Sequence, residues 1–172
     1  GDKVFVSGSI GGASLGLRLL HGEFDTLTRA QAAGLKTCFL RPSPRVGLGQ
    51  ALVGTAHAAT DVSDGLVADV GHICAPAGVG AHLNISSIPL SNATRAALDM
   101  APDLLPELLS SGDDYELVFT APAGERDALS AISSSTGVTI TEIGTIVDIP
   151  GVLVFDADGG TIQFQKAGYQ HF

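Results

Sequence analysis

Several residue types are scarce in this sequence. It has no tryptophan, one methionine and two cysteines among 172 residues, and only 5% of its residues are aromatic. Cys38 and Cys74 lie far apart, with neither a Cys-x-x-Cys spacing nor a nearby pair of metal-ligating residues. The sequence therefore argues against a disulfide framework or a cysteine-based metal site. This cysteine usage favours the reducing cytoplasm as the compartment.

Basic residues are also scarce, with nine lysines and arginines against 18 acidic residues and a net charge of −9. Such a charge repels a phosphate backbone, so we expect no nucleic-acid partner, and any phosphorylated ligand should bind together with divalent cations. No apolar run approaches the ~18 residues that a membrane span requires, and no signal peptide opens the chain. We therefore expect no membrane partner.

What is present is a pattern of short strands and helices with enough apolar residues, 45%, for one packed domain over residues 1–172. Helices alternate irregularly with strands, which predicts an α+β fold with a mixed sheet packed against helices. The expected strands are 4–8, 80–85, 117–120 and 138–143, followed by a closing hairpin of 152–155 with 161–164. The expected helices are 15–20, 23–36, 46–56, one from 66 that ends within 75–78, 93–100, 102–110 and 123–133.

The first acidic segment, residues 61–66 (Asp-Val-Ser-Asp-Gly-Leu), precedes a predicted helix and can be interpreted in two ways. Asp61 or Ser63 could cap that helix, with Asp64 complementing its dipole. Alternatively, the two carboxylates could hold Mg²⁺ and a phosphorylated ligand, with the Ser63 hydroxyl and the N–H groups of the helix start directed at the same anion. The residues alone leave both interpretations open.

The second acidic segment, residues 112–117 (Gly-Asp-Asp-Tyr-Glu-Leu), leads into a predicted strand, where acidic side chains are commonly just solvated. A period of two places Asp114 and Glu116 on one face and Asp113 and Tyr115 on the other. Asp113 is the freer candidate for binding a ligand because it lies nearest the loop. The two acidic segments form one site if the fold brings them together.

Other polar or glycine-rich features carry weaker signals. The glycine-rich turn at 8–16 has neither the Gly-x-Gly-x-x-Gly spacing nor a following Lys-Ser/Thr, so tight packing explains its glycines better than phosphate binding does. His21, His57, His72 and His82 are scattered, and we assign none of them a role.

Taken together, five stretches resemble the carboxy-terminal domain of the thiamine-monophosphate kinases, in the AIR synthase-like (PurM-like) superfamily. The stretches are 1–8, 41–46 (Arg-Pro-Ser-Pro-Arg-Val), 61–66, 112–120 and the ending 168–172 (Gly-Tyr-Gln-His-Phe). The Asp-x-Ser-Asp-Gly-Leu turn is shared in looser form by sister families, whereas its combination with the other stretches is specific.

The resemblance implies an α+β PurM-like domain from an enzyme that uses ATP and Mg²⁺ to phosphorylate thiamine monophosphate to thiamine diphosphate. By this resemblance Asp61 and Asp64 bind Mg²⁺, Ser63 contacts ATP, and Asp113 and Tyr169 contact the thiamine substrate. No residue of this chain is implied as a catalytic group.

The chain also departs from the family pattern. Asp113 stands where the family usually has glutamate, Ser111 replaces a glycine, Gly12 replaces an aspartate and Gln170 replaces an acid. The family's amino-terminal ATP-binding domain is absent, and the chain begins at Gly1 without an initiator methionine. We therefore expect part of a longer protein, with its own amino-terminal domain as partner and a homodimer at full length. Alone, the chain should have negligible kinase activity because phosphoryl transfer requires several charged groups at once.

Two other functions are compatible with the sequence. One is a different ATP-dependent enzyme of the superfamily, of the hydrogenase-maturation or selenophosphate-synthase type, although the Tyr-Gln-His-Phe ending argues against it. The other is a non-catalytic docking domain whose acidic segments serve only as caps. Magnesium-dependent nucleotide binding would count against the docking domain.

Overall fold

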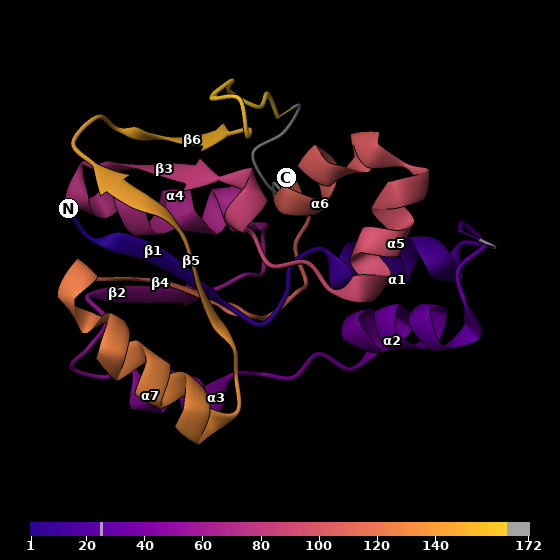
Figure 1. Cartoon of the computed structure of the whole chain (residues 1–172), viewed down its shortest axis with the longest axis horizontal. Coiled ribbons are helices and arrows are strands. Elements are labelled where there is room, and N and C mark those ends of the chain that lie inside the picture. The colour runs from indigo at the N-terminus through magenta and orange to yellow at the C-terminus, as the bar shows by residue number, and fades with distance from the viewer. Residues whose placement is uncertain (25, 165–172) are drawn as a thin grey trace.

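The computed structural model describes residues 1–24 and 26–164, which form one mixed six-stranded sheet with helices around it (Figure 1). The sheet order is β2-β4-β1-β5-β3-β6. Its neighbours pair antiparallel except β3 and β6, which run parallel. The strands are β1 (Lys3–Ser7), β2 (Ala58–Asp61), β3 (Gly80–Asn84), β4 (Leu117–Ala121), β5 (Ile140–Val147) and β6 (Gly151–Phe155). The predicted α+β class with a mixed sheet is confirmed.

Helices and short 3₁₀ turns connect these strands. The helices are α1 (Gly12–Leu20), α2 (Arg29–Leu40), α3 (Val46–Ala51), α4 (Leu66–Ala77), α5 (Asn92–Met100), α6 (Leu105–Ser110) and α7 (Arg126–Thr136). The 3₁₀ turns are η1 (Ile85–Ser87), η2 (Pro102–Leu104) and η3 (Ala123–Glu125). Within residues 1–24 and 26–164, no helix combines the length and apolar character needed to span a bilayer.

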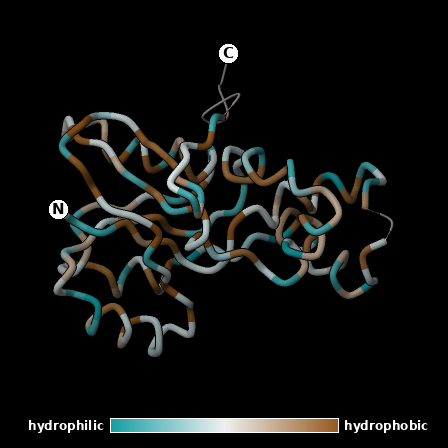
Figure 2. Tube along the Cα trace, turned by 45° about the horizontal axis from the view of Figure 1, so that its top comes forward, coloured by the Kyte–Doolittle hydropathy of each residue, from teal (hydrophilic) through white to brown (hydrophobic). Residues whose placement is uncertain are grey.

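Alternation along the central strand β1 divides the apolar core between the two faces of the sheet. Val4 and Val6 join the core cluster under α4, whereas Phe5 points to the opposite face, under α3 and α7. On that face the Phe5 ring stacks on Phe119 of the neighbouring strand at a centroid distance of 5.4 Å. In Figure 2, hydrophobic and hydrophilic colours alternate along the helices that cover these faces, as amphipathic helices require.

A third apolar cluster lies away from the sheet, among α1, α2, α5 and α6 at the right of Figure 1. Its buried members are Leu15, Leu19, Leu35, Ala97 and Leu108. Helices α1 and α2 pack closely because Gly16 has no side chain. A Cβ there would lie 2.2 Å from the carbonyl oxygen of Leu35. This helical cluster adjoins the second acidic segment, because α6 ends at Ser110.

Several predicted elements have different bounds. Helix α2 begins at Arg29 rather than 23, because Thr28 forms a capping box with Gln31. Helix α3 ends at Ala51 rather than 56, in a turn where Gly54 adopts a φ of 87°. The predicted helix 123–133 begins as the 3₁₀ turn η3 and continues as α7 to Thr136.

The predicted closing hairpin forms only next to its turn, where two backbone hydrogen bonds and one antiparallel bridge join its segments. Strand β6 pairs in parallel with β3, and its only bridge to the following segment joins Phe155 to Thr161 within the described residues. The turn between them closes on a side chain, because Asp156 Oδ1 accepts the backbone N–H groups of Asp158 and Gly160 at 2.9 and 2.7 Å. Local polar bonds therefore replace a second hairpin strand.

Candidate functional site

The fold places the two acidic segments side by side. Strands β2 and β4 pair up to Asp61, and backbone hydrogen bonds continue the contact beyond the strands. The N–H of Tyr115 donates to the Val62 carbonyl at 2.9 Å, and the N–H of Asp113 donates to the Ser63 carbonyl at 3.1 Å. The segments that were separated by about fifty residues of chain thus form one surface.

Glycines make this close approach possible. A Cβ at Gly112 would lie 1.8 Å from the Ser63 carbonyl oxygen, closer than any side-chain atom can come. Gly65 has a φ of 119°, and a Cβ there would lie 2.6 Å from the Ser110 carbonyl oxygen. The backbone of the first acidic segment consequently packs directly against the end of α6 and the start of the second acidic segment.

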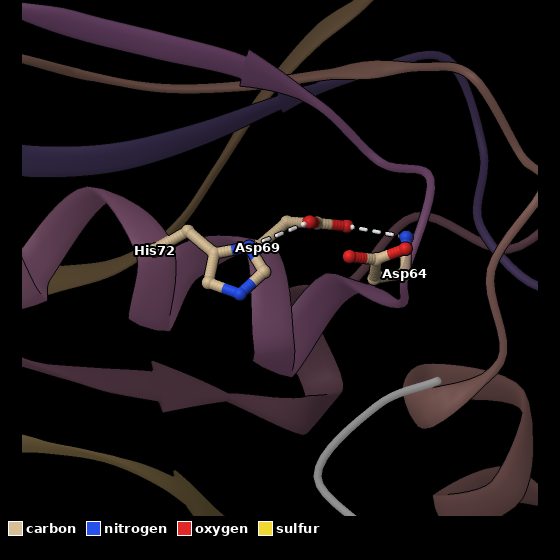
Figure 3. Close-up of side chains that lie close together, drawn as sticks. All are labelled: Asp64, Asp69 and His72. Carbon is tan, nitrogen blue, oxygen red and sulfur yellow. Dashed lines mark hydrogen bonds and ion pairs between the residues drawn. The ribbon is translucent and has the colours of Figure 1, made fainter. Parts of the chain in front are cut away.

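The backbone of the first acidic segment wraps around a buried carboxylate from α4 (Figure 3). Oδ2 of Asp69 accepts hydrogen bonds from the N–H groups of Ser63, Asp64 and Gly65 at 3.0, 3.0 and 3.1 Å. The other carboxylate oxygen lies 3.3 Å from Nδ1 of His72. Only 2% of Asp69 is exposed, and this burial raises the pKa of its carboxyl, against the opposing effect of the N–H bonds.

This arrangement overturns several expectations for the first acidic segment. The N-cap of α4 is Gly65 and makes no side-chain cap bond, so neither Asp61 nor Ser63 caps the helix. The N–H groups of residues 63–65, which precede the first turn of α4, donate to Asp69 and are therefore not directed outward at a phosphate. A helical pattern with Leu66, Val70 and Ile73 on one face leaves Asp69 off that face, yet Asp69 is buried because the turn folds over its carboxylate.

Asp61, Asp64 and Asp113 all contribute negative charge around the side chain of Tyr115. In the part of the chain that the structure describes, the side chains of Asp61 and Asp64 have no hydrogen-bond or ion-pair partner. The phenol donates to Oδ1 of Asp113 at 3.3 Å. The charge of Asp113 is the largest cause of the raised pKa of Tyr115, and Asp61 and Asp64 add smaller contributions. The two acidic segments therefore create an electronegative environment around Tyr115.

The backbone of the second acidic segment alternates, although it is irregular and not a strand. Asp113 and Tyr115 adopt φ values of 70° and 50°, in the left-handed region that non-glycine residues seldom occupy. Asp114 and Glu116, between and after them, face the protein interior. The predicted division of these four side chains into two sets is confirmed.

Asp114 anchors the second acidic segment to the glycine-rich turn. Its carboxylate accepts the N–H groups of Gly11 and Ala13 at 2.7 and 3.1 Å, at the start of α1. Burial raises the pKa of Asp114 to about 6, against the lowering effect of these N–H bonds. The glycine-rich turn therefore binds an internal carboxylate in the place where a phosphate-binding loop would bind its ligand.

Glu116 anchors the segment to the centre of the sheet. Arg45 donates to both of its oxygens, from Nε at 2.7 Å and from Nη2 at 2.6 Å, and Ser7 Oγ donates at 2.5 Å. Gly8, with a φ of 57°, accommodates this carboxylate, since a Cβ there would lie 2.0 Å from its Oε1. The packing explanation for the glycines of this turn is confirmed.

The donor set beside Ser63 fits Mg²⁺ through its outward acids. Asp64, Asp69 and His72 bring potential ligand atoms within 4.8 Å of one another. However, one Asp69 oxygen already accepts three N–H bonds, and Mg²⁺ prefers oxygen ligands over imidazole. Asp61 and Asp64 offer the one or two carboxylates that Mg²⁺ takes when phosphate oxygens and water complete its shell.

A small cleft of about 250 Å³ opens beside Asp61. Its lining residues are Pro44, Arg45, Val46, Gly49, Asp61, Tyr115 and Leu117. A larger cleft of about 310 Å³ lies at β3, β5 and β6, away from both acidic segments, with His82 and Glu142 among its lining residues. The smaller cleft is the one that adjoins the acidic surface. Tyr169, predicted to contact substrate, lies outside the described residues.

Residues 1–156 match the family described as AIR synthase related protein, C-terminal domain. The chain belongs to this family. The thiamine-monophosphate kinase of Salmonella typhimurium is 40% identical over 173 residues, covering 100% of this chain and 53% of the relative. The crystal structure of thiamine-monophosphate kinase from Stenotrophomonas maltophilia K279a is similar at a TM-score of 0.84 and 46% identity, over 94% of this chain and 51% of that chain.

Two further solved structures are similar to this chain. AaThiL complexed with AMPPCP and TMP has a TM-score of 0.81 and 32% identity, over 100% of this chain and 52% of that chain. The hydrogenase maturation protein HypE of E. coli has a TM-score of 0.71 at 22% identity, over 96% of this chain and 49% of that chain, and shares the fold alone. The family member described here spans about half the length of these relatives.

Sequence reasoning missed the residues that hold the site in place. Asp69 received no role because it follows the motif by several residues, and Arg45 because its partner Glu116 is 71 residues away in the chain. Gly112 was read only as part of a motif. Gly112 packs so closely against the Ser63 carbonyl that no side chain fits between them, and residue spacing does not predict this tertiary contact. An acid in the first turn of a helix that follows an Asp-Gly turn was the one local signal for Asp69.

Proposed function

We propose that this chain is the carboxy-terminal half of a kinase that transfers the γ-phosphate of ATP to thiamine monophosphate, giving thiamine diphosphate. The observation that carries the proposal is the contact of the two acidic segments, in which Asp113 lies against Ser63, between Asp61 and Asp64 in the chain. The relatives that span this chain are thiamine-monophosphate kinases, and AaThiL is a protein complexed with AMPPCP and TMP.

In this proposal Asp61 and Asp64 hold Mg²⁺, whose charge would neutralise the phosphate oxygens during transfer. Ser63 contacts ATP through its hydroxyl, because its own N–H is already bonded to Asp69. Asp113 binds the thiamine substrate, together with Tyr169. The exposed Asp113 carboxylate is one methylene shorter than the family's glutamate, and its left-handed backbone directs it outward beside the Tyr115 hydroxyl.

The remaining catalytic groups belong, in this proposal, to an amino-terminal ATP-binding domain in the same longer protein, which acts as a homodimer. This chain contributes ligands and no catalytic residue, so alone it should have negligible activity. The cytoplasm is the proposed compartment, in keeping with free Cys38 and Cys74.

The structure disfavours the docking-domain alternative on one point. That alternative requires the acids of the first segment to be helix caps, and the N-cap of α4 is Gly65, with no side-chain cap bond. Two acids without partners within one turn repel each other unless a cation offsets them. A sister enzyme of the superfamily remains the second candidate, supported by the shared fold of HypE at low identity.

The test is magnesium-dependent formation of thiamine diphosphate from ATP and thiamine monophosphate by the full-length protein. Asp61→Asn should lower the rate by about 100-fold or more, because the carboxylate that holds Mg²⁺ is lost. Asp158→Asn, which changes an exposed acid in the turn after β6, is the matched control and should leave the rate unchanged. A folded wild-type protein that binds Mg²⁺ and ATP but makes no thiamine diphosphate would favour a sister enzyme.

A further inference from the structure

Asp69 is a buried side chain that contacts the proposed magnesium-binding turn, residues 61–66, from inside. We propose that Asp69 is the positioning residue of this turn: it fixes the backbone of residues 63–65 so that the Asp61 and Asp64 carboxylates stay turned toward the cation. The inference rests on the proposed function, because it assigns Asp69 a role in the same site. Asp69 touches neither cation nor substrate in this role and acts through the turn.

The geometry is that of an anion-binding backbone loop whose anion is part of the protein. Three consecutive N–H groups converge on the single oxygen Oδ2 of Asp69, at 3.0 to 3.1 Å. Successive backbone N–H groups of this kind form a concave site for negative charge. Water cannot take over the role of the carboxylate, since Asp69 is only 2% exposed. Removing its charge would leave N–H donors buried without a full partner.

The direction of these bonds decides how the turn can recognise a phosphorylated ligand. The N–H groups of Ser63, Asp64 and Gly65 are committed to Asp69, so they are withheld from phosphate oxygens. The outer surface of the turn then offers carboxylates and one hydroxyl. In this proposal the turn therefore contacts phosphate through Mg²⁺ and the Ser63 hydroxyl, and the precision of the turn matters chiefly for the cation.

The neighbouring His72 supports this role from the other side. Its Nδ1 lies 3.3 Å from Oδ1 of Asp69, opposite the oxygen that holds the turn (Figure 3). The imidazole is largely exposed, and the two residues are three positions apart on α4. Asp69 is thus fixed on both oxygens, which limits the rotation of its side chain and the movement of the turn.

The test compares Asp69→Asn with wild type in the full-length protein by three measurements. The amide keeps the side-chain size, but it has one accepting oxygen and directs an NH₂ group at the remaining donors. We expect Mg²⁺ affinity, from calorimetric titration with MgCl₂ and ATP, to fall about 10- to 100-fold, as for other residues that orient metal ligands. Amide hydrogen exchange of residues 63–65 should accelerate, while the KM for thiamine monophosphate at saturating Mg²⁺ should change less than about 2-fold.

The matched control is Asp127→Asn, which changes an exposed acid in the first turn of α7 and should leave all three quantities unchanged. Asp69→Glu keeps the charge but displaces the accepting oxygen, so a partial loss of Mg²⁺ affinity is expected. It replaces Asp69→Asn if the amide variant does not fold.

Unchanged Mg²⁺ affinity in a folded Asp69 variant would overturn the positioning role. Equal losses for Mg²⁺ and thiamine monophosphate would overturn it as well, because they would indicate general damage to the domain. The proposed function fails by a different result: wild-type protein that makes no thiamine diphosphate. In that case Mg²⁺ titration and amide exchange still decide whether Asp69 orders the turn.

Discussion

The two acidic segments have similar compositions and lie against each other, yet their carboxylates have opposite surroundings. In the first, Asp61 and Asp64 face outward without a side-chain partner in the described residues, and the internal bonds are made by the backbone. In the second, Asp114 and Glu116 are bound by donors from α1 and from Arg45. The carboxylates of an acidic motif are therefore available to a ligand where the fold supplies no donor, and stabilise the fold where it supplies one. Substitutions that neutralise one acid at a time separate the two cases.

The largest effect on stability is expected from Glu116→Gln. It should reduce the free energy of unfolding by about 3–5 kcal/mol, because it leaves the Arg45 guanidinium without its bidentate partner. Glu142→Gln weakens a bidentate pair with the exposed Arg126 and should have little effect on stability, because solvent screens this pair. Urea unfolding of the chain measures both. Equal losses would mean that the burial of Glu116 adds nothing.

Gly112→Ala disrupts the contact between the two acidic segments and should lower the free energy of unfolding by about 2 to 3 kcal/mol. The added Cβ would lie 1.8 Å from the Ser63 carbonyl, so the segments must separate. Gly124→Ala is the control, because a Cβ there meets no atom within 4 Å. Magnesium-dependent activity of the full-length protein should fall with Gly112→Ala. Full activity together with lost stability would show that the contact between the segments does not shape the site.

Asp114 should make stability depend on pH. Its pKa in the folded chain is about 6, above the ordinary value near 4, so the folded state binds more protons than the unfolded state between these values. Stability therefore rises as the pH falls from about 6 to about 4, by roughly 2 kcal/mol. Asp114→Asn should lack this component, while exposed Asp103→Asn should keep it. Parallel pH curves for wild type and Asp114→Asn would contradict the prediction.

The smallest effect is expected from Asp64→Asn, which changes a carboxylate that has no internal partner. Stability should stay within about 0.5 kcal/mol of wild type, or rise slightly as repulsion from Asp61 is relieved. Asp69→Asn, five residues along, should destabilise the chain by about 2 kcal/mol or more. Thermal unfolding of the two variants side by side measures the contrast. A large loss of stability in Asp64→Asn would show that the carboxylates of the first acidic segment also stabilise the fold.

Local patterns in the sequence were enough to predict most elements but not how they pair. Runs of apolar and β-branched residues indicate β1, β4 and β5, and Ser91 at the start of α5 is a typical N-cap residue whose side chain accepts the Thr94 N–H. The parallel pairing of β6 with β3 joins segments far apart in the chain. The turn residues 156–160 predict a local hairpin and give no sign of this distant partner. Period-two alternation separated Asp114 and Glu116 from their neighbours even without a strand.

The site was predictable only in part for the same reason. Motifs gave Asp61, Ser63, Asp64 and Asp113 as candidates, and these assignments of roles stay predictions. Whether the two segments meet depends on the β2–β4 pairing. Some acids bind internal donors that lie far away in the chain, as Glu116 binds Arg45. The spacing of the residues within each motif predicts neither these donors nor the pairing of the strands.

The position of β6 at one end of the sheet has a consequence for how copies of the chain behave in solution. This strand, Gly-Val-Leu-Val-Phe, is uncharged and rich in β-branched residues, and its outer edge is a potential template for adding further strands. The bridge from Phe155 to Thr161 and the bond from Ile162 N to the Val154 carbonyl cover the end of this edge, and Asp148 and Asp156 flank the strand with negative charge. Residues 161–162 thus cover part of the edge of β6, which should make pairing of this strand with a second copy of the chain less favourable.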